Sequence, residues 1–263
     1  MPSVGRGPHS LETVALLLAL LVSHPGRVHL LRGNPETAAV NATMGLRAEC
    51  EARLGSEEEG EALWERLNRV FDWLPLAALV GGRVLCVHGG IGGTLRSVAD
   101  IDALRRPLDG GGPIGDVAND LLWSDPATAP SLQGIAPSSM RGEGATEFGA
   151  GRLRDFCAAA GVEMVVRGHE CVAHGVERFG GAGAGAPQLL TVFSAANYCG
   201  SLANSAALLL LDRDLVCTAL LLASGEAEGA GATRGDARGA AEEEEEEEGA
   251  AAWELVAAGG RAR

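Results

Sequence analysis

The chain has 263 residues, of which 46% are hydrophobic and 21% charged, enough for one sizeable folded domain with a buried core. Its formal net charge is -14, and 4 arginines against 11 acids after residue 223 (4 - 11 = -7) place half of that charge in the last 40 residues. The remainder carries no basic stripe, which excludes nucleic-acid binding. The longest early apolar run, Val14 to Val22, is too short to cross a membrane.

The first expected element is a helix at residues 11–23, which ends before Pro25-Gly26. Ser10 is the expected N-cap, and the apolar run 14–22 is expected to be buried. A cleaved signal peptide is the alternative interpretation of that run.

Further elements follow in the first two thirds of the chain. In order, we expect a strand at 27–31, helices at 38–54 and 61–71, a strand at 83–87 and a helix at 98–104. An acidic connector, 56–60, separates the two longer helices. Two long loops rich in glycine, 109–115 and 125–145, come next because proline and glycine interrupt regular structure.

The last third is mainly strand. We expect a helix at 152–160, a hairpin tip at 180–186, and strands at 163–166, 189–193, 206–211 and 216–222. Helices mixed with strands in this way predict an α/β sandwich of mixed sheets flanked by helices. Residues 1–223 are expected to form this domain, and the Gly, Ala and Glu composition of 224–263 predicts a disordered acidic tail.

Cysteine spacing indicates the compartment. None of the six cysteines forms a CxxC pair, and several lie in apolar runs. Buried free thiols in a reducing compartment are expected, which places the protein in the cytoplasm, the nucleus or both.

Three segments share one design, in which an apolar strand leads to a polar residue beside a glycine. They are Leu30 to Asn34, Leu85 to Gly90 and Val165 to His169. Their polar residues, Asn34, His88 and His169, are expected at one rim of a sheet. Amide oxygen and imidazole nitrogen together suit a divalent ion such as Mn, Fe or Zn.

Three arginines stand beside glycine: Arg6, Arg141 and Arg167. A guanidinium can hold a phosphate through two parallel hydrogen bonds. A surface salt bridge is the alternative role for each, and the sequence leaves both open.

Five strings occur in a characteristic order: Leu-Leu-Arg-Gly-Asn (30–34), His-Gly-Gly (88–90), Leu-Leu-Trp-Ser-Asp-Pro (121–126), Arg-Gly-His (167–169) and Phe-Ser-Ala-Ala-Asn-Tyr-Cys-Gly (193–200). Together they resemble the phosphoprotein phosphatase family of Ser/Thr protein phosphatases, over roughly residues 4–222. The finer resemblance is to plant and algal Kelch-repeat phosphatases, through residues 68–71, 74–78, 88–92 and 167–172.

This resemblance implies a metallophosphatase-like αββα fold, two divalent metals and a phosphoprotein substrate. Asn34, His88 and His169 match three ligands of the second metal. The matching substrate contacts are Arg6 and Arg141, which hold the phosphate, Tyr198, which lines the site, and Asp125, an acid near the substrate groove.

Departures from the family pattern fall in the first part of the chain. Pro2 stands where the family has its bridging Asp, Gly5 where it has a second Asp, and Pro35 where it has a general-acid His. The family segment that supplies the first metal has no match here, and neither has a Kelch repeat. The expectation is a catalytic domain without its N-terminal part, with at most one metal site partly retained.

Three hypotheses follow from the resemblance. The first is a Ser/Thr phosphatase of impaired activity, represented by a truncated gene model. The second is a pseudophosphatase that binds phosphoproteins without hydrolysing them. The third is a remnant that folds poorly because sheet interior is exposed.

Overall fold

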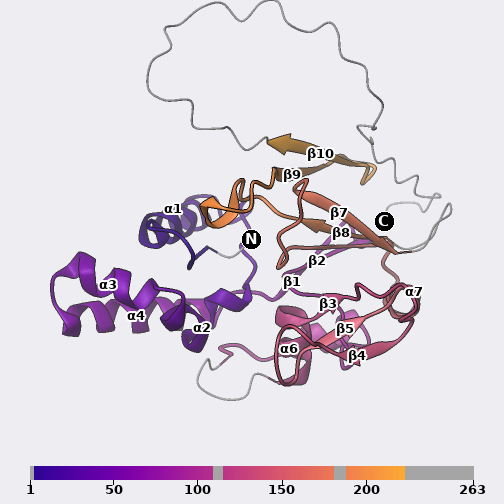
Figure 1. The fold of residues 1–263 in the computed structure, drawn as a ribbon, viewed down its shortest axis with the longest axis horizontal. Coiled ribbons are helices and arrows are strands. Elements are labelled where there is room, and N and C mark those ends of the chain that lie inside the picture. The colour runs from indigo at the N-terminus through magenta and orange to yellow at the C-terminus, as the bar shows by residue number, and fades with distance from the viewer. Residues whose placement is uncertain (1–2, 109–114, 181–187, 223–263) are drawn as a thin grey trace, which may run out of the picture.

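A computed structural model describes residues 3–108, 115–180 and 188–222 (Figure 1). The predicted loop at 109–115 and the hairpin tip at 180–186 fall almost entirely outside these ranges, and the predicted acidic tail lies wholly outside them. So does Pro2. Within the described residues, no helix is long and apolar enough to cross a membrane.

The centre of the fold is a five-stranded sheet in the order β1-β2-β6-β8-β7. Its strands are β1 (Ala77–Val80), β2 (Val84–Val87), β6 (Met164–Arg167), β7 (Val176–Gly180) and β8 (Gln188–Val192). The three inner strands, β2, β6 and β8, run parallel, and β1 and β7 pair antiparallel at the two edges. The carboxyl ends of the parallel strands therefore meet at one rim.

One face of this sheet is covered by helices and a small sheet (Figure 1). The covering elements are α5 (Val98–Asp102), α6 (Asp116–Trp123), α7 (Ala150–Ala160), β3 (Asp125–Pro126), β4 (Ile135–Pro137) and β5 (Thr146–Phe148). Leu85 and Val165 of the sheet share a buried cluster with Leu122, Phe148 and Phe156 of this layer. Removing these side chains from water stabilises the layer.

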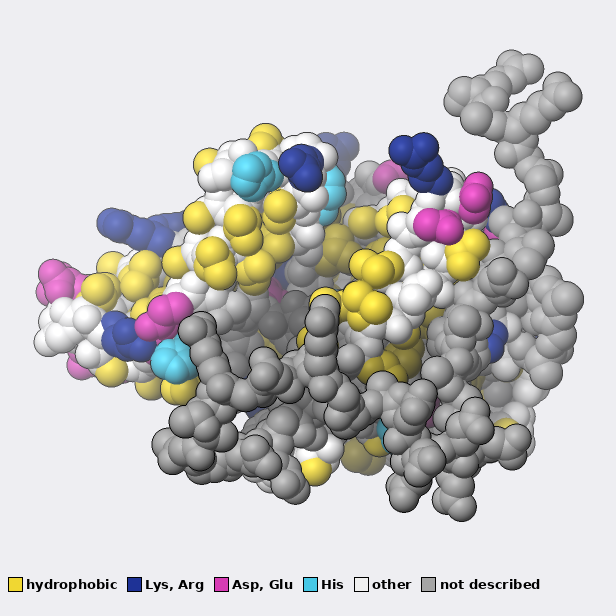
Figure 2. Space-filling view, turned by 90° about the horizontal axis from the view of Figure 1, so that it is seen from above, with side chains coloured by type: hydrophobic (Ala, Val, Ile, Leu, Met, Phe, Trp, Pro, Cys, Tyr) yellow, Lys and Arg dark blue, Asp and Glu magenta, His cyan; other side chains and the backbone are white. Residues whose placement is uncertain are grey.

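The opposite face packs against a two-stranded antiparallel sheet, β9 (Ala206–Leu211) with β10 (Cys217–Leu222). Val84, Met164 and Leu190 meet Cys217 there in a separate buried cluster. The α/β class with mixed sheets and flanking helices is thus confirmed. The far side of β9 and β10 exposes Leu208, Leu210, Leu220 and Leu222. Figure 2, viewed from above Figure 1, shows hydrophobic side chains on this face of the molecule.

Residues 3–74 form a helical lobe beside the sheets. It contains α1 (Ser10–Ser23), the 3-10 helix η1 (Asn34–Glu36), α2 (Ala38–Thr43), α3 (Leu46–Leu54) and α4 (Glu57–Phe71). Its core includes Val14, Leu46, Cys50 and Phe71. A second 3-10 helix, η2 (Tyr198–Gly200), lies between β8 and β9.

Two expectations about α1 are wrong. Ser10 is not its N-cap: the backbone N–H groups of Ser10 and Leu11 donate to the carboxylate of Glu49 on α3, at 3.1 and 3.0 Å. A side chain from another helix thus satisfies the first donors. Most of the apolar run is also not buried: Val14 is in the core, but Leu16 is 61% exposed and Val22 79%.

Other predicted boundaries also need correction. Residues 27–31 form no strand, because this extended segment finds no partner strand. The helix expected at 38–54 is divided by Gly45, whose φ of 102° is left-handed. The acidic connector begins α4 instead, where Ser56 Oγ accepts the backbone N–H of Glu59 at 3.2 Å.

The six cysteines differ in how far they are buried. All six cysteines are free, but only Cys50, Cys157 and Cys217 are buried, and Cys199 is exposed.

Candidate functional site

The site begins where the parallel strands end. His88 directly follows β2, and His169 lies two residues after β6. The backbone N–H of Gly168 donates to the carbonyl of His88 at 3.1 Å, which ties the two strand ends together. Side chains beyond the carboxyl ends of parallel strands are placed to meet a ligand.

Three donor atoms converge at this rim. His88 Nε2 lies 2.6 Å from Asn34 Oδ1 and 3.1 Å from His169 Nδ1. The fold therefore brings together the predicted trio of Asn34, His88 and His169. In the sequence, Asn34 is 54 positions from His88 and His169 is 81 positions from it.

Arg32 supports the turn that carries Asn34, and its side chain is only 1% exposed. Arg32 donates to the carbonyls of Glu36 and Leu108 at 3.0 and 3.2 Å, and to Asp72 Oδ1 at 2.7 Å. A guanidinium with three partners fixes the turn that presents Asn34. Sequence reasoning missed this role, because arginine ordinarily indicates surface.

Glu36 completes this support. Its carboxylate is buried and accepts the backbone N–H of Gly33 at 2.8 Å. It also accepts the N–H and the hydroxyl of Ser3, at 2.6 and 2.8 Å. The turn with Asn34 and the segment that leads to Arg6 are thus joined through one carboxylate.

Both histidines are held as neutral imidazoles. Burial, followed by the charges of His169 and Arg167, places the pKa of His88 well below its usual value. Burial, with Arg141 and Arg167 nearby, lowers the pKa of His169 to about 2. A neutral imidazole offers a lone pair to a metal.

The donor set fits one divalent cation. Two imidazole nitrogens and an amide oxygen suit a borderline ion such as Zn, Mn or Fe. Among the described residues, the buried His169 Nε2 has no hydrogen-bond partner, so none of them fixes the tautomer of this ring through Nε2. Nowhere in the described ranges are three His, Cys, Asp or Glu side chains grouped to hold a metal, and at this site the third donor is the amide of Asn34.

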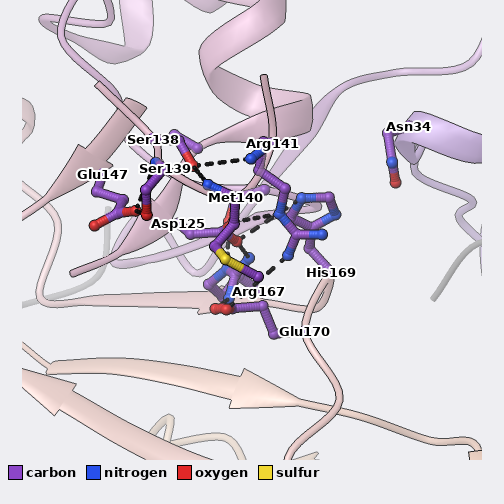
Figure 3. Close-up of polar contacts among 12 residues, drawn as sticks. Asn34, Asp125, Ser138, Ser139, Met140, Arg141, Glu147, Arg167, His169 and Glu170 are labelled. Atoms are coloured by element: carbon purple, nitrogen blue, oxygen red, sulfur yellow. Dashed lines mark hydrogen bonds and ion pairs between the residues drawn. The ribbon is translucent and has the colours of Figure 1, made fainter. Parts of the chain in front are cut away.

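Asp125 lies between two guanidinium groups (Figure 3). Its Oδ2 accepts Nε of Arg141 and its Oδ1 accepts Nη2 of Arg167, both at 2.6 Å. Arg167 Nη1 also donates to Glu170 Oε2 at 2.7 Å. The same Asp125 Oδ1 lies 3.8 Å from His169 Nε2. In Figure 3, Asn34 lies apart from Asp125 and the two arginines.

This network distinguishes Arg167 from Arg141, two of the three arginines whose role the sequence left open. Arg167 is fully buried and also donates to the carbonyl of Gly89, so its role is structural. Arg141 is 27% exposed, and Asp125 orients it. Asp125 itself is 5% exposed, so it acts through Arg141 and is not open to a substrate.

A cavity of about 600 Å³ opens above the donor atoms. Arg6, Arg141, Tyr198 and Pro35 line it together with the three predicted ligands. None of the described residues that line it is Asp or Glu, although the chain has a net charge of -14. The cavity is therefore a locally cationic site suited to an anion.

Backbone strain gathers around this cavity. Arg6, His169, Asn197 and Cys199 line it and have positive φ angles of 51°, 68°, 44° and 58°. Only two other non-glycine residues of the described chain share this conformation, Ala203 and Leu215. Strain of this kind marks places where the fold constrains a side chain for function.

Aromatic rings support the same residues. Trp123, at the end of α6, contacts His169 edge to face with ring centroids 5.8 Å apart. Phe193 contacts Tyr198 in the same way at 5.0 Å. Burial raises the pKa of the Tyr198 phenol, which therefore stays neutral.

Comparisons with known proteins agree with this geometry. The family described as calcineurin-like phosphoesterase matches residues 4–173. Serine/threonine-protein phosphatase BSL2 of Arabidopsis thaliana is 46% identical over 220 residues, which cover 83% of this chain and 21% of that protein.

A solved protein serine/threonine phosphatase from Saccharomyces cerevisiae, with similarity to human phosphatase PP5, superposes with a TM-score of 0.72 at 26% identity. The match covers 85% of this chain and 69% of that one. The chain spans about a fifth of the length of the Arabidopsis relative.

Proposed function

The chain belongs to the calcineurin-like phosphoesterase family, and from that premise we propose that it is a protein-serine/threonine phosphatase domain of low turnover. Its substrates are phosphoserine and phosphothreonine in cytoplasmic or nuclear proteins. The plant relative that is named a serine/threonine-protein phosphatase supports this proposal, as does the yeast phosphatase structure.

The observation that carries the proposal is the position of the donor trio at the base of a cationic cavity. A phosphate that enters this cavity meets Arg6 and Arg141, and no described carboxylate on the lining repels it. Guanidinium groups match the geometry of phosphate oxygens. Tyr198 adds a neutral hydroxyl beside them.

Asn34, His88 and His169 would hold the metal. A divalent ion bound there would polarise phosphate oxygens and make bound water more acidic. The protein itself orients the ligands through Arg32 and Glu36, and holds Arg141 through Asp125.

Low turnover follows from Pro35. Its ring carries no proton to give to a leaving oxygen, yet it lies on the cavity wall beside Asn34. Unless another side chain on the wall supplies the proton equally well, turnover falls on the order of 10² to 10⁴-fold.

The test is turnover of a phosphoserine peptide with added Mn or Zn, by the parent chain and by His169→Ala. Metal-dependent turnover that His169→Ala abolishes supports the proposal. His174→Ala is the matched control, since His174 is an exposed histidine five residues further on. Turnover that survives His169→Ala would contradict the proposed site.

A second candidate function is a pseudophosphatase that binds phosphoproteins without hydrolysis. Pro35 favours it, because the arginines can bind a phosphate that is never cleaved. Binding of the phosphopeptide that Arg141→Ala weakens, with no turnover at any metal concentration, would favour this function. Arg66→Ala on the exposed surface of α4 is the matched control.

A further inference from the structure

Cleavage of a phosphoserine places a chemical demand on the cavity. The leaving group is a serine alkoxide, which is strongly basic and must receive a proton as the P–O bond breaks. A positioned side chain that gives this proton accelerates such reactions substantially. This demand applies only if the proposed phosphatase function holds, so the inference rests on that function.

Few side chains on the described cavity wall carry a proton that a leaving oxygen could take. His88 and His169 belong to the donor trio that would hold the metal. Burial raises the pKa of Tyr198, which makes it a weaker acid. His9 is the remaining imidazole on the wall, and it is not part of the donor trio.

His9 is placed by the start of α1. Its carbonyl accepts the hydroxyl of Thr13 at 2.8 Å, and the next residue is fixed by Glu49. Three residues before it stands Arg6, which lines the same cavity. The short segment that presents an arginine to the phosphate therefore also presents an imidazole.

Glu12 gives the imidazole an acidic neighbour. His9 Nδ1 lies 3.9 Å from Glu12 Oε2, an ion-pair distance once the ring is protonated, while Arg53 pairs with the other oxygen of Glu12 at 2.8 Å. The His9 side chain is 71% exposed, so a substrate can reach it.

We propose that His9 is the proton donor to the leaving serine or threonine oxygen. The oxygen of water bonds to phosphorus while the bond from phosphorus to the serine oxygen breaks. The imidazolium of His9 gives its proton to that oxygen, which leaves as the alcohol. The proton that the attacking water loses passes to solvent, and solvent returns the imidazole to its acid form.

The test compares two esters that differ in their need for a proton. A phosphoserine peptide releases a basic alkoxide, whereas 4-nitrophenyl phosphate releases a stable phenolate that needs little assistance. Both are measured on the full chain with saturating Zn or Mn, for the parent and for His9→Gln. His24→Gln, at the exposed far end of the same helix, is the matched control.

We expect His9→Gln to lower turnover of the phosphoserine peptide about 100-fold and that of 4-nitrophenyl phosphate less than about twofold. His24→Gln should change neither. An equal fall for both esters, or a fall for neither, overturns the role of His9 while the phosphatase function stands. Absence of 4-nitrophenyl phosphate turnover by the parent chain overturns the phosphatase function and this inference together.

Discussion

His88 Nε2 lies 2.6 Å from Asn34 Oδ1, so a strand end of the central sheet and a turn of the helical lobe meet at one point. The two side chains contact directly, and an ion that binds there would take the place of that contact. Affinity for the ion therefore depends on both lobes.

Asn34→Ala should remove the oxygen donor of this trio. Loss of a supporting contact alone costs about 10- to 100-fold in metal affinity, and loss of a ligand should cost at least the upper value. Zinc content after equilibrium dialysis, measured by mass spectrometry, checks this. Asn119→Ala is the control, since Asn119 lies half-buried on α6 and does not line the cavity; equal zinc retention by both variants would contradict the assignment.

Stability of the metal-free chain should fall as pH falls below 6.5. The unfolded state protonates both histidines near their ordinary value, whereas folded His169 stays neutral until about pH 2 and His88 stays neutral well below 6.5. The unfolded state therefore binds more protons, and each histidine removes about 1.4 kcal/mol per pH unit.

Burial raises the pKa of Glu170. This raised pKa increases the free energy of unfolding as the pH falls, which is opposite to the effect of the histidines. The net expectation is a free energy of unfolding about 2 kcal/mol lower at pH 5.5 than at pH 7.5. Urea titrations with a chelator present measure it. Equal values at the two pH values would show that the histidines are not held neutral.

Asp125→Asn should destabilise the fold by about 3 kcal/mol, because it leaves the fully buried Arg167 without one of its two charged partners. Denaturant unfolding gives the value. Asp155→Asn is the control, since Asp155 is exposed and pairs only with its neighbour Arg154; it should change stability by less than about 0.5 kcal/mol. A loss no larger than that of the control would contradict the structural role of Asp125.

Gly90→Ala should also destabilise, by about 1 to 3 kcal/mol. An added Cβ would lie 2.3 Å from Cε1 of Phe148 and 3.0 Å from the carbonyl oxygen of Ser124. Gly134→Ala meets nothing within 4 Å and serves as the control. Equal melting temperatures for the two variants would show that the strand end behind His88 has room to relax.

The inner strands and the donor trio were predictable because their signals are local. Apolar runs predicted β2, β6 and β8, and the polar residues beside glycine after β2 and β6 predicted His88 and His169. The strand expected at 27–31 failed for the opposite reason. An extended segment becomes a strand only where a partner lies beside it, and no local pattern shows that.

β1 and β7 were missed because edge strands carry weaker patterns. The sequence of β7 includes Glu177 and Arg178, which read as a loop. Arg32 and Arg167 could not be distinguished from surface arginines, since their burial depends on acceptors contributed from distant parts of the chain, such as Leu108 and Asp125.

The left-handed residues around the cavity lower the stability of the fold but place their side chains on the cavity wall. A residue other than glycine in this conformation lowers the stability of the fold by on the order of 1 kcal/mol, whereas glycine adopts it without that cost. Replacing Arg6, Asn197 or Cys199 by glycine would relax the backbone while erasing side chains from the cavity wall. A requirement for stability alone would favour glycine at these positions, so the arginine at position 6 points to a demand other than stability.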